Sequence, residues 1–200
     1  HSATYLPDQD VVVLAGGLRA DGRTDPVVDV VDLETGAVTV AGELEESRAQ
    51  HRAIRADSGD VWVMGGWSPV GGALRSTELI TVEDGILEIE SDVEMEDERY
   101  GFGLAEISFG PDNSVVACGG YSSFTSRDKT DSCELIIQGV SSQETWTMPQ
   151  PVSGLDLYAL NGSNDLIAMG GRRPDGTPVG ATLLAFHVSS GSSLSEPDGS

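Results

Sequence analysis

The side chains that could support acid–base, nucleophilic or metal chemistry are few in this sequence. Its 200 residues include three histidines, His1, His51 and His187, and two cysteines, Cys118 and Cys133. No stretch matches the phosphate-binding Gly-Lys-Ser/Thr loop, the His-Glu-x-x-His zinc motif or the Gly-x-Ser-x-Gly nucleophile motif. No Cys-x-x-Cys spacing suggests a metal, and two cysteines are too few for a disulfide scaffold. We therefore predict no catalytic residues, no metal site and no cofactor.

A second group of side chains, basic and aromatic, suits binding rather than catalysis. Seven of the 11 basic residues and three aromatic residues fall in the short segments that follow four Gly-Gly pairs. They are Arg19, Arg23, Trp67, Arg75, Tyr121, Phe124, Arg127, Lys129, Arg172 and Arg173. Exposed aromatic residues beside arginine favour recognition, so we predict a binding surface here. The alternative is that the basic residues neutralise acidic segments nearby, such as residues 90–98.

The Gly-Gly pairs end short apolar runs that recur at a steady period. They begin at Gly16, Gly65, Gly119 and Gly170, with spacings of 49, 54 and 51 residues. A turn rich in Pro, Asp, Asn and Gly precedes each run. Another short apolar segment precedes that turn. Third strands are expected to open at Asp29, Glu78, Glu134 and Leu183, and fourth strands to lie around Val38, Leu87, Trp146 and Leu194. The pattern predicts an all-β chain of four antiparallel four-stranded units, over residues 1–47, 48–98, 99–150 and 151–200.

This repeat resembles the kelch repeat, whose hallmark is an apolar strand that ends in Gly-Gly. Further kelch-like features are Arg48 and His51 before the first strand of the second unit, the acidic residues that open third strands, and Trp146 in a fourth strand. Apolar residues replace that tryptophan in the other units, so the repeats are divergent. The resemblance covers the whole chain and implies a β-propeller whose four-stranded blades number four here. Kelch propellers usually close with more blades than four. The four could close on themselves, form a segment of a longer protein, or be completed by a neighbouring copy.

The charge balance excludes several classes of partner. There are 33 acidic and 11 basic residues, which gives a formal net charge of −22. Phosphate backbones and anionic lipid surfaces repel such a chain, so we expect no nucleic-acid binding. No apolar run approaches the roughly 18 residues that a membrane span needs, so we expect no membrane insertion. Hydrophobic residues make up 38%, which is enough for a globular core.

Three features bear on the compartment in which the protein works. In the third unit, Cys118 ends the second strand and Cys133 begins the third, so the two could form a disulfide or stay buried as free thiols. Asn161 begins an Asn-Gly-Ser sequon for N-glycosylation, in a predicted turn. The chain starts at His1 rather than Met. Together these features predict an extracellular or cell-surface protein, with a cytoplasmic protein as the alternative.

The sequence as a whole predicts a non-catalytic binding or structural module. We expect it to contact a protein partner, or a glycan, through the segments that follow the Gly-Gly pairs. The partner could be the missing blades of a longer chain or further copies of the same chain. In self-assembly, the acidic face of one copy would meet the basic loops of the next. One alternative is the propeller part of a sugar-active oxidase, lyase or epimerase, and another is an intracellular kelch adaptor.

Overall fold

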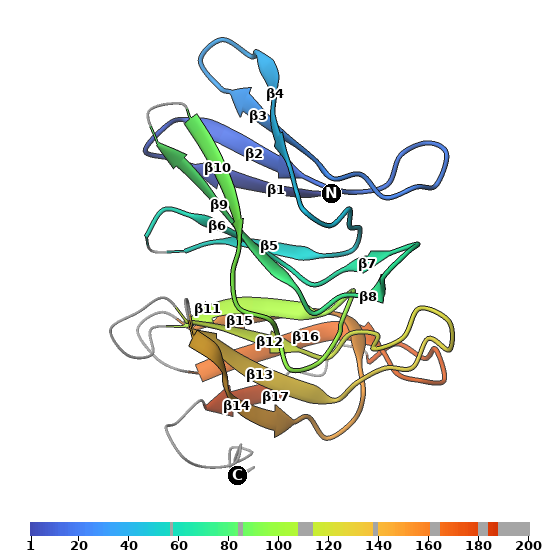
Figure 1. The fold of residues 1–200 in the computed structure, drawn as a ribbon. Helices are drawn as coiled ribbons and strands as arrows, with labels where there is room; N and C mark the ends of the chain where they lie inside the picture. Colours follow the sequence, from blue (N-terminus) through green and yellow to red (C-terminus); the bar gives the residue numbers. More distant parts are fainter. Residues whose placement is uncertain are drawn as a thin grey trace.

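The computed structural model describes residues 1–56, 58–83, 86–107, 114–137, 140–160, 165–179 and 184–187. Every regular element within these ranges is a β-strand. Three four-stranded antiparallel sheets follow one another along the chain, and a three-stranded sheet comes after them (Figure 1).

The strands of each sheet are nearly consecutive in the sequence. The first sheet contains β1 (Ser2–Leu6), β2 (Val11–Ala15), β3 (Val27–Asp32) and β4 (Val38–Glu43). The second contains β5 (Arg52–Arg55), β6 (Val61–Met64), β9 (Thr77–Glu83) and β10 (Ile86–Ser91). The third contains β11 (Gly103–Ile107), β12 (Ser114–Cys118), β13 (Ser132–Ile137) and β14 (Val140–Thr147). The fourth contains β15 (Ser153–Ala159), β16 (Asp165–Arg172) and β17 (Leu184–His187). A short hairpin, β7 (Trp67–Ser68) and β8 (Gly72–Ala73), lies between β6 and β9.

The predicted antiparallel four-stranded units are confirmed for the first three sheets. Trp146 lies in β14, in the predicted fourth strand of its unit. In the last unit, three strands are described, and the predicted positions Leu183 and Leu194 lie outside the described residues. The β7–β8 hairpin is an addition that the repeat pattern does not predict, because its strands have only two residues each.

Apolar residues of successive sheets pack against each other, so the sheets form a stack (Figure 1). Val13 of the first sheet and Val63 of the second belong to one buried cluster. Trp62, on the opposite face of β6, packs in a second cluster with Ala117 of the third sheet. A third cluster joins β12, β13 and β14 to β15 and β16. The two middle sheets are covered on both faces, which explains why β6 and β12 are continuous apolar runs rather than alternating ones.

The Gly-Gly pairs lie where the next sheet approaches most closely. The second glycine of the first three pairs donates its backbone N–H at 2.8 Å to a carbonyl that precedes the next sheet: Gly17 to Arg48, Gly66 to Arg99, and Gly120 to Val152. A Cβ on the first glycine would lie 2.6 Å from the Arg99 oxygen at Gly65, and 2.4 Å from the Val152 oxygen at Gly119. Both first glycines also have a left-handed φ, of +57° and +66°. The repeated motif therefore marks the junctions between sheets.

A buried ion pair recurs in the second and third sheets. Arg48 Nη2 lies 2.6 Å from Glu78 Oε1, and Arg99 Nη2 lies 2.5 Å from Glu134 Oε1. The four side chains are at most 2% exposed. Each carboxylate also accepts two backbone N–H groups from the connection that enters its sheet. The arginine and the acidic residue of the repeat thus fix this connection against the sheet.

Cys118 and Cys133 stand opposite each other on β12 and β13 and form a disulfide. Of the two alternatives that the sequence leaves open, the structure therefore contains the bridge. Disulfides persist in oxidising compartments, so the bridge indicates such a compartment. Among the described residues there is no helix that could cross a membrane.

Candidate functional site

The segments that follow the Gly-Gly pairs emerge on one side of the stack, at the right in Figure 1. We call this side the loop face, and it consists of residues 18–26, 67–76, 121–131 and 172–179 together with the connections that enter the sheets. Because neighbouring strands are antiparallel, the connections that enter each sheet, such as that before β11, reach the same side. Binding residues are often carried by loops of this kind above a rigid sheet scaffold.

Four aromatic rings from the second and third units form a cluster on the loop face. Trp67 stacks on Phe124 with ring centroids 4.3 Å apart, and Tyr100 stacks on Tyr121 at 4.9 Å. Tyr100 and Phe124 are 6.2 Å apart and tilted, which joins the two stacked pairs. Trp67 and Tyr100 are buried, whereas Phe124 is 44% exposed. The cluster therefore offers one apolar ring to solvent on a rigid support.

Backbone pairing holds the cluster in place. Trp67 and Ala49 exchange two N–H···O bonds, and Tyr121 and Tyr100 exchange two more, all between 2.9 and 3.1 Å.

Burial is the main cause of a raised pKa at Tyr100, and the neighbouring Tyr121 adds to it. The Tyr100 hydroxyl therefore stays neutral at physiological pH.

Lys129 connects the aromatic cluster to the fourth loop. Its Nζ lies 5.3 Å from the centroid of the Tyr121 ring. It also donates to the carbonyl oxygens of Arg172 at 2.8 Å and Arg173 at 2.5 Å. The cation thus bridges the third and fourth units across the loop face, and the Tyr121 face contributes a cation–π contact.

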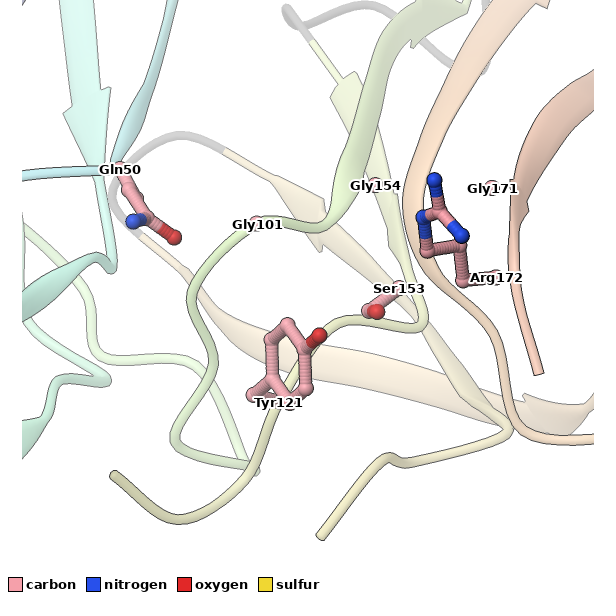
Figure 2. Close-up of a pocket in the computed structure, with 7 residues that line it drawn as sticks. All are labelled: Gln50, Gly101, Tyr121, Ser153, Gly154, Gly171 and Arg172. Atoms are coloured by element: carbon pink, nitrogen blue, oxygen red, sulfur yellow. The ribbon is translucent and has the colours of Figure 1, made fainter. Parts of the chain in front are cut away.

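Beside Tyr121 lies a pocket whose floor is backbone at one repeated position. Gln50, Gly101 and Gly154 occupy this position and have left-handed φ angles of 53°, 60° and 67°. Gly101 donates its N–H to the Gln50 carbonyl at 3.0 Å, and Gly154 donates its N–H to the Gly101 carbonyl at 2.6 Å. This ladder joins three successive sheets. The pocket has a volume of about 280 Å³ and is lined by Gln50, Gly101, Tyr121, Ser153, Gly154, Gly171 and Arg172 (Figure 2).

Four side chains from three successive units bring polar groups to this pocket, with Ser153 and Arg172 both from the fourth sheet. Figure 2 shows the Gln50 amide and the Tyr121 hydroxyl on its left and lower sides, with Ser153 and Arg172 opposite. Within the described part of the chain, the Gln50, Tyr121 and Ser153 side chains make no hydrogen bond. Arg172 Nη1 donates to the Gly176 carbonyl at 3.0 Å, which leaves its other N–H groups available. A guanidinium with neutral hydrogen-bond donors beside it can bind a ligand that has a carboxylate and further polar groups.

Eight of the ten predicted binding residues fall into two groups. The structure brings Trp67, Tyr121, Phe124, Lys129 and Arg172 together. Other predicted residues contact carboxylates of their own neighbourhood: Arg19 pairs with Asp25 at 2.8 Å, Arg23 with Asp21 at 3.7 Å and Arg75 with Glu94 at 2.5 Å. Those three contacts fit the alternative in which basic residues neutralise nearby acidic ones.

The remaining predicted residues lie at the edges of the site or outside the described residues. Arg173 donates to the Gln150 side chain at 2.9 Å and to the Pro178 carbonyl at 2.8 Å. Arg127 is exposed, with a left-handed φ of 56°. Asn161, the predicted glycosylation site, lies outside the described residues.

Three side chains of the site, besides the backbone of Gly101 and Gly154, are absent from the sequence prediction. Tyr100, Gln50 and Ser153 do not follow a Gly-Gly pair but precede or begin the first strand of the next sheet. The signal that could have found them is the strand alternation, which puts the connections after the second and fourth strands on one face.

Among the described residues, no three His, Cys, Asp or Glu side chains lie close enough together to hold a metal ion. Comparison of the sequence with models of known protein families and with curated proteins gives no match.

Proposed function

We propose that the protein is a non-catalytic binding module that holds a protein partner on its loop face. The observation that carries this proposal is the continuous site formed by Phe124, the Tyr100–Tyr121 stack and the pocket beside Arg172. Tyr121 and Arg172 line the same pocket, and Phe124 joins it through Tyr100; aromatic and arginine side chains dominate the binding energy of many protein interfaces.

We also propose that the stacked sheets are blades of a kelch-like β-propeller. Three features support it: the period of the Gly-Gly pairs, the burial of each middle sheet between its neighbours, and the backbone ladder through Gln50, Gly101 and Gly154. A ladder that joins the same position of successive sheets is expected where blades surround a common axis. The pocket would then lie close to that axis.

The chemistry of the site suggests what the partner presents. Phe124 can be covered by an apolar side chain, and the N–H groups of Arg172 can pair with an Asp or Glu carboxylate. The net charge of −22 favours partners whose wider surface is basic. We therefore expect a carboxylate and an apolar side chain within an otherwise basic surface. The disulfide supports the proposal that this contact takes place outside the cell or at its surface.

A displayed library of short random peptides tests the proposal, because such a selection requires no identified partner. Peptides selected on the wild-type chain should contain a carboxylate close to an apolar residue. Their affinity should fall by about tenfold or more on Phe124→Ser and on Arg172→Gln. Ile86→Ser is the matched control, because Ile86 is 66% exposed and begins β10 at the opposite end of the strands. Selected peptides that bind all four proteins equally would contradict a loop-face site.

A further inference from the structure

The first sheet leaves one apolar face exposed. Strand register places Tyr5, Val12, Val31 and Val38 in one row across the four strands. The next row of the same face holds Ala3, Leu14, Asp29 and Val40, so it contains one acidic residue. Tyr5, Val38 and Val40 are 49%, 63% and 68% exposed. Contiguous apolar area of this kind marks an interaction surface.

The same face of the second sheet is buried. Val63 occupies the position of Leu14 in the repeat and is 0% exposed, because the first sheet covers it. Ile89 in β10 occupies the position of Val38, because Val31 and Ile80, their partners in the neighbouring strand, stand at one repeat position, and Ile89 packs against that same cluster. The exposed face of the first sheet therefore corresponds to the face of the second sheet that packs against the sheet before it.

The last sheet shows the other half of that contact. Met169 stands where Met64 stands in the second sheet, yet Met169 is 44% exposed and Met64 is 0% exposed. The register partner of Met169 is Asp156, which pairs with Arg52. Tyr158, in the next row of the same face, is 51% exposed, and Leu160 after the strand is 45% exposed. The glycines differ in the same way. A Cβ on Gly16, Gly65 or Gly119 would lie within 2.8 Å of a backbone oxygen of the next sheet, whereas a Cβ on Gly170 would have no atom within 4 Å.

We propose that the exposed face of β15–β17 in one copy packs on the exposed face of β1–β4 in a second copy. The contact repeats, between copies, the one that joins successive sheets within the chain. Figure 1 shows β1–β4 at the top and β17 near the bottom of the picture, and the exposure of Val40 and Met169 shows that a single copy does not pack the two faces together. A head-to-tail contact between different surfaces forms a ring when the rotation closes.

A ring of two copies has the number of sheets expected for a closed propeller. The described parts of two copies supply eight sheets of three or four strands, leaving out the β7–β8 hairpins, which is within the range of about four to eight blades found in β-propellers. The number of copies rests on the proposed propeller. The contact between copies does not, because it is inferred from the two exposed faces. The proposed contact joins faces that are mainly apolar, with Asp29 on one and Asp156 on the other, and so differs from the self-assembly of an acidic face with basic loops expected from the sequence.

Analytical ultracentrifugation of the chain at several concentrations and salt levels tests the proposal. We expect a mass of two copies of 20.9 kDa, or a larger closed multiple, that persists at high salt. Val40→Asp and Met169→Asp should each weaken self-association by about tenfold or more, since each places a charge in the contact. Val70→Asp is the control, because Val70 is 99% exposed at the tip of the β7–β8 hairpin, away from both faces.

Mixing the two variants separates this contact from a symmetric one. The Val40→Asp copy keeps an intact last sheet, and the Met169→Asp copy keeps an intact first sheet, so the mixture should form a two-chain complex that neither variant forms alone. Circular dichroism and the unfolding midpoint check that each variant folds, with Val38→Lys as the second variant of the first face. A monomer at every concentration, or an assembly that Met169→Asp leaves intact, would overturn the proposal.

Discussion

Arg99 Nη2 lies 2.5 Å from Glu134 Oε1, and both side chains are 0% exposed. The guanidinium also donates to the carbonyl oxygens of Gly119 and Ser132, and the carboxylate accepts two backbone N–H groups. The pair therefore connects the entrance of the third sheet to its Gly-Gly turn and to β13. A buried pair of this kind contributes little relative to apolar residues of the same shape, but removing one partner leaves a buried charge.

Arg99→Met should therefore lower the free energy of unfolding by about 3–5 kcal/mol, since Glu134 would remain buried without its cation. Urea denaturation of the wild type and the variant measures this change. Arg75→Met is the matched control, because Arg75 and Glu94 are both about half exposed and such surface pairs contribute at most about 1 kcal/mol. Equal losses of unfolding free energy in the two variants would show that the buried pair contributes no more to stability than the surface pair.

The sheets could be predicted because their signals are local in the sequence. Apolar runs before Gly16, Gly65 and Gly119 become β2, β6 and β12, and the Gly-Gly pairs reflect a contact that recurs in every junction. The arrangement of the loop face could not be predicted as well. Trp67 is buried beneath Phe124 rather than exposed, because the third loop folds over the second.

The partners of the basic residues depend on loop conformation, which the repeat does not specify. Arg19 turns back to Asp25 within its own loop, whereas Lys129 crosses to the carbonyls of the fourth loop. The pocket is a product of three sheets, since Gln50, Gly101 and Gly154 are about fifty residues apart and converge only when the sheets stack.

Gly119 offers a test of the junction between the third and fourth sheets. Gly119→Ala should destabilise the protein by several kcal/mol, because its Cβ would lie 2.4 Å from the Val152 oxygen in addition to the strain of φ +66°. Gly22→Ala is the control, because Gly22 has φ +82° but open space around its Cβ position, and should lose only about 1–2 kcal/mol. Thermal and urea unfolding compare the two. A loss at Gly119 no larger than that at Gly22 would argue against a close junction.

The disulfide should contribute measurably to stability. Cys118 and Cys133 are 15 residues apart, and a bridge closing a loop of that length is expected to contribute about 3 kcal/mol. The double variant Cys118→Ala/Cys133→Ala should therefore unfold at lower urea concentration than the oxidised wild type. Adding a reductant should destabilise the wild type and leave the double variant unchanged. If the reductant shifts both proteins equally, the bridge is not the cause.

His51 predicts a specific dependence of stability on pH. Burial, followed by the nearby charge of Arg48, lowers the pKa of His51 from 6.5 to about 3 in the folded protein. Between these two pH values, His51 is protonated in the unfolded chain but not in the folded chain. The free energy of unfolding therefore falls as the pH drops, by up to about 1.4 kcal/mol per pH unit. His51→Phe should remove this contribution, and Phe102 fills the corresponding position of the third unit. Urea unfolding of both proteins from neutral pH to about pH 4 measures the difference. Carboxylates titrate in both proteins and cancel in the comparison, so a difference that stays constant with pH would contradict the prediction.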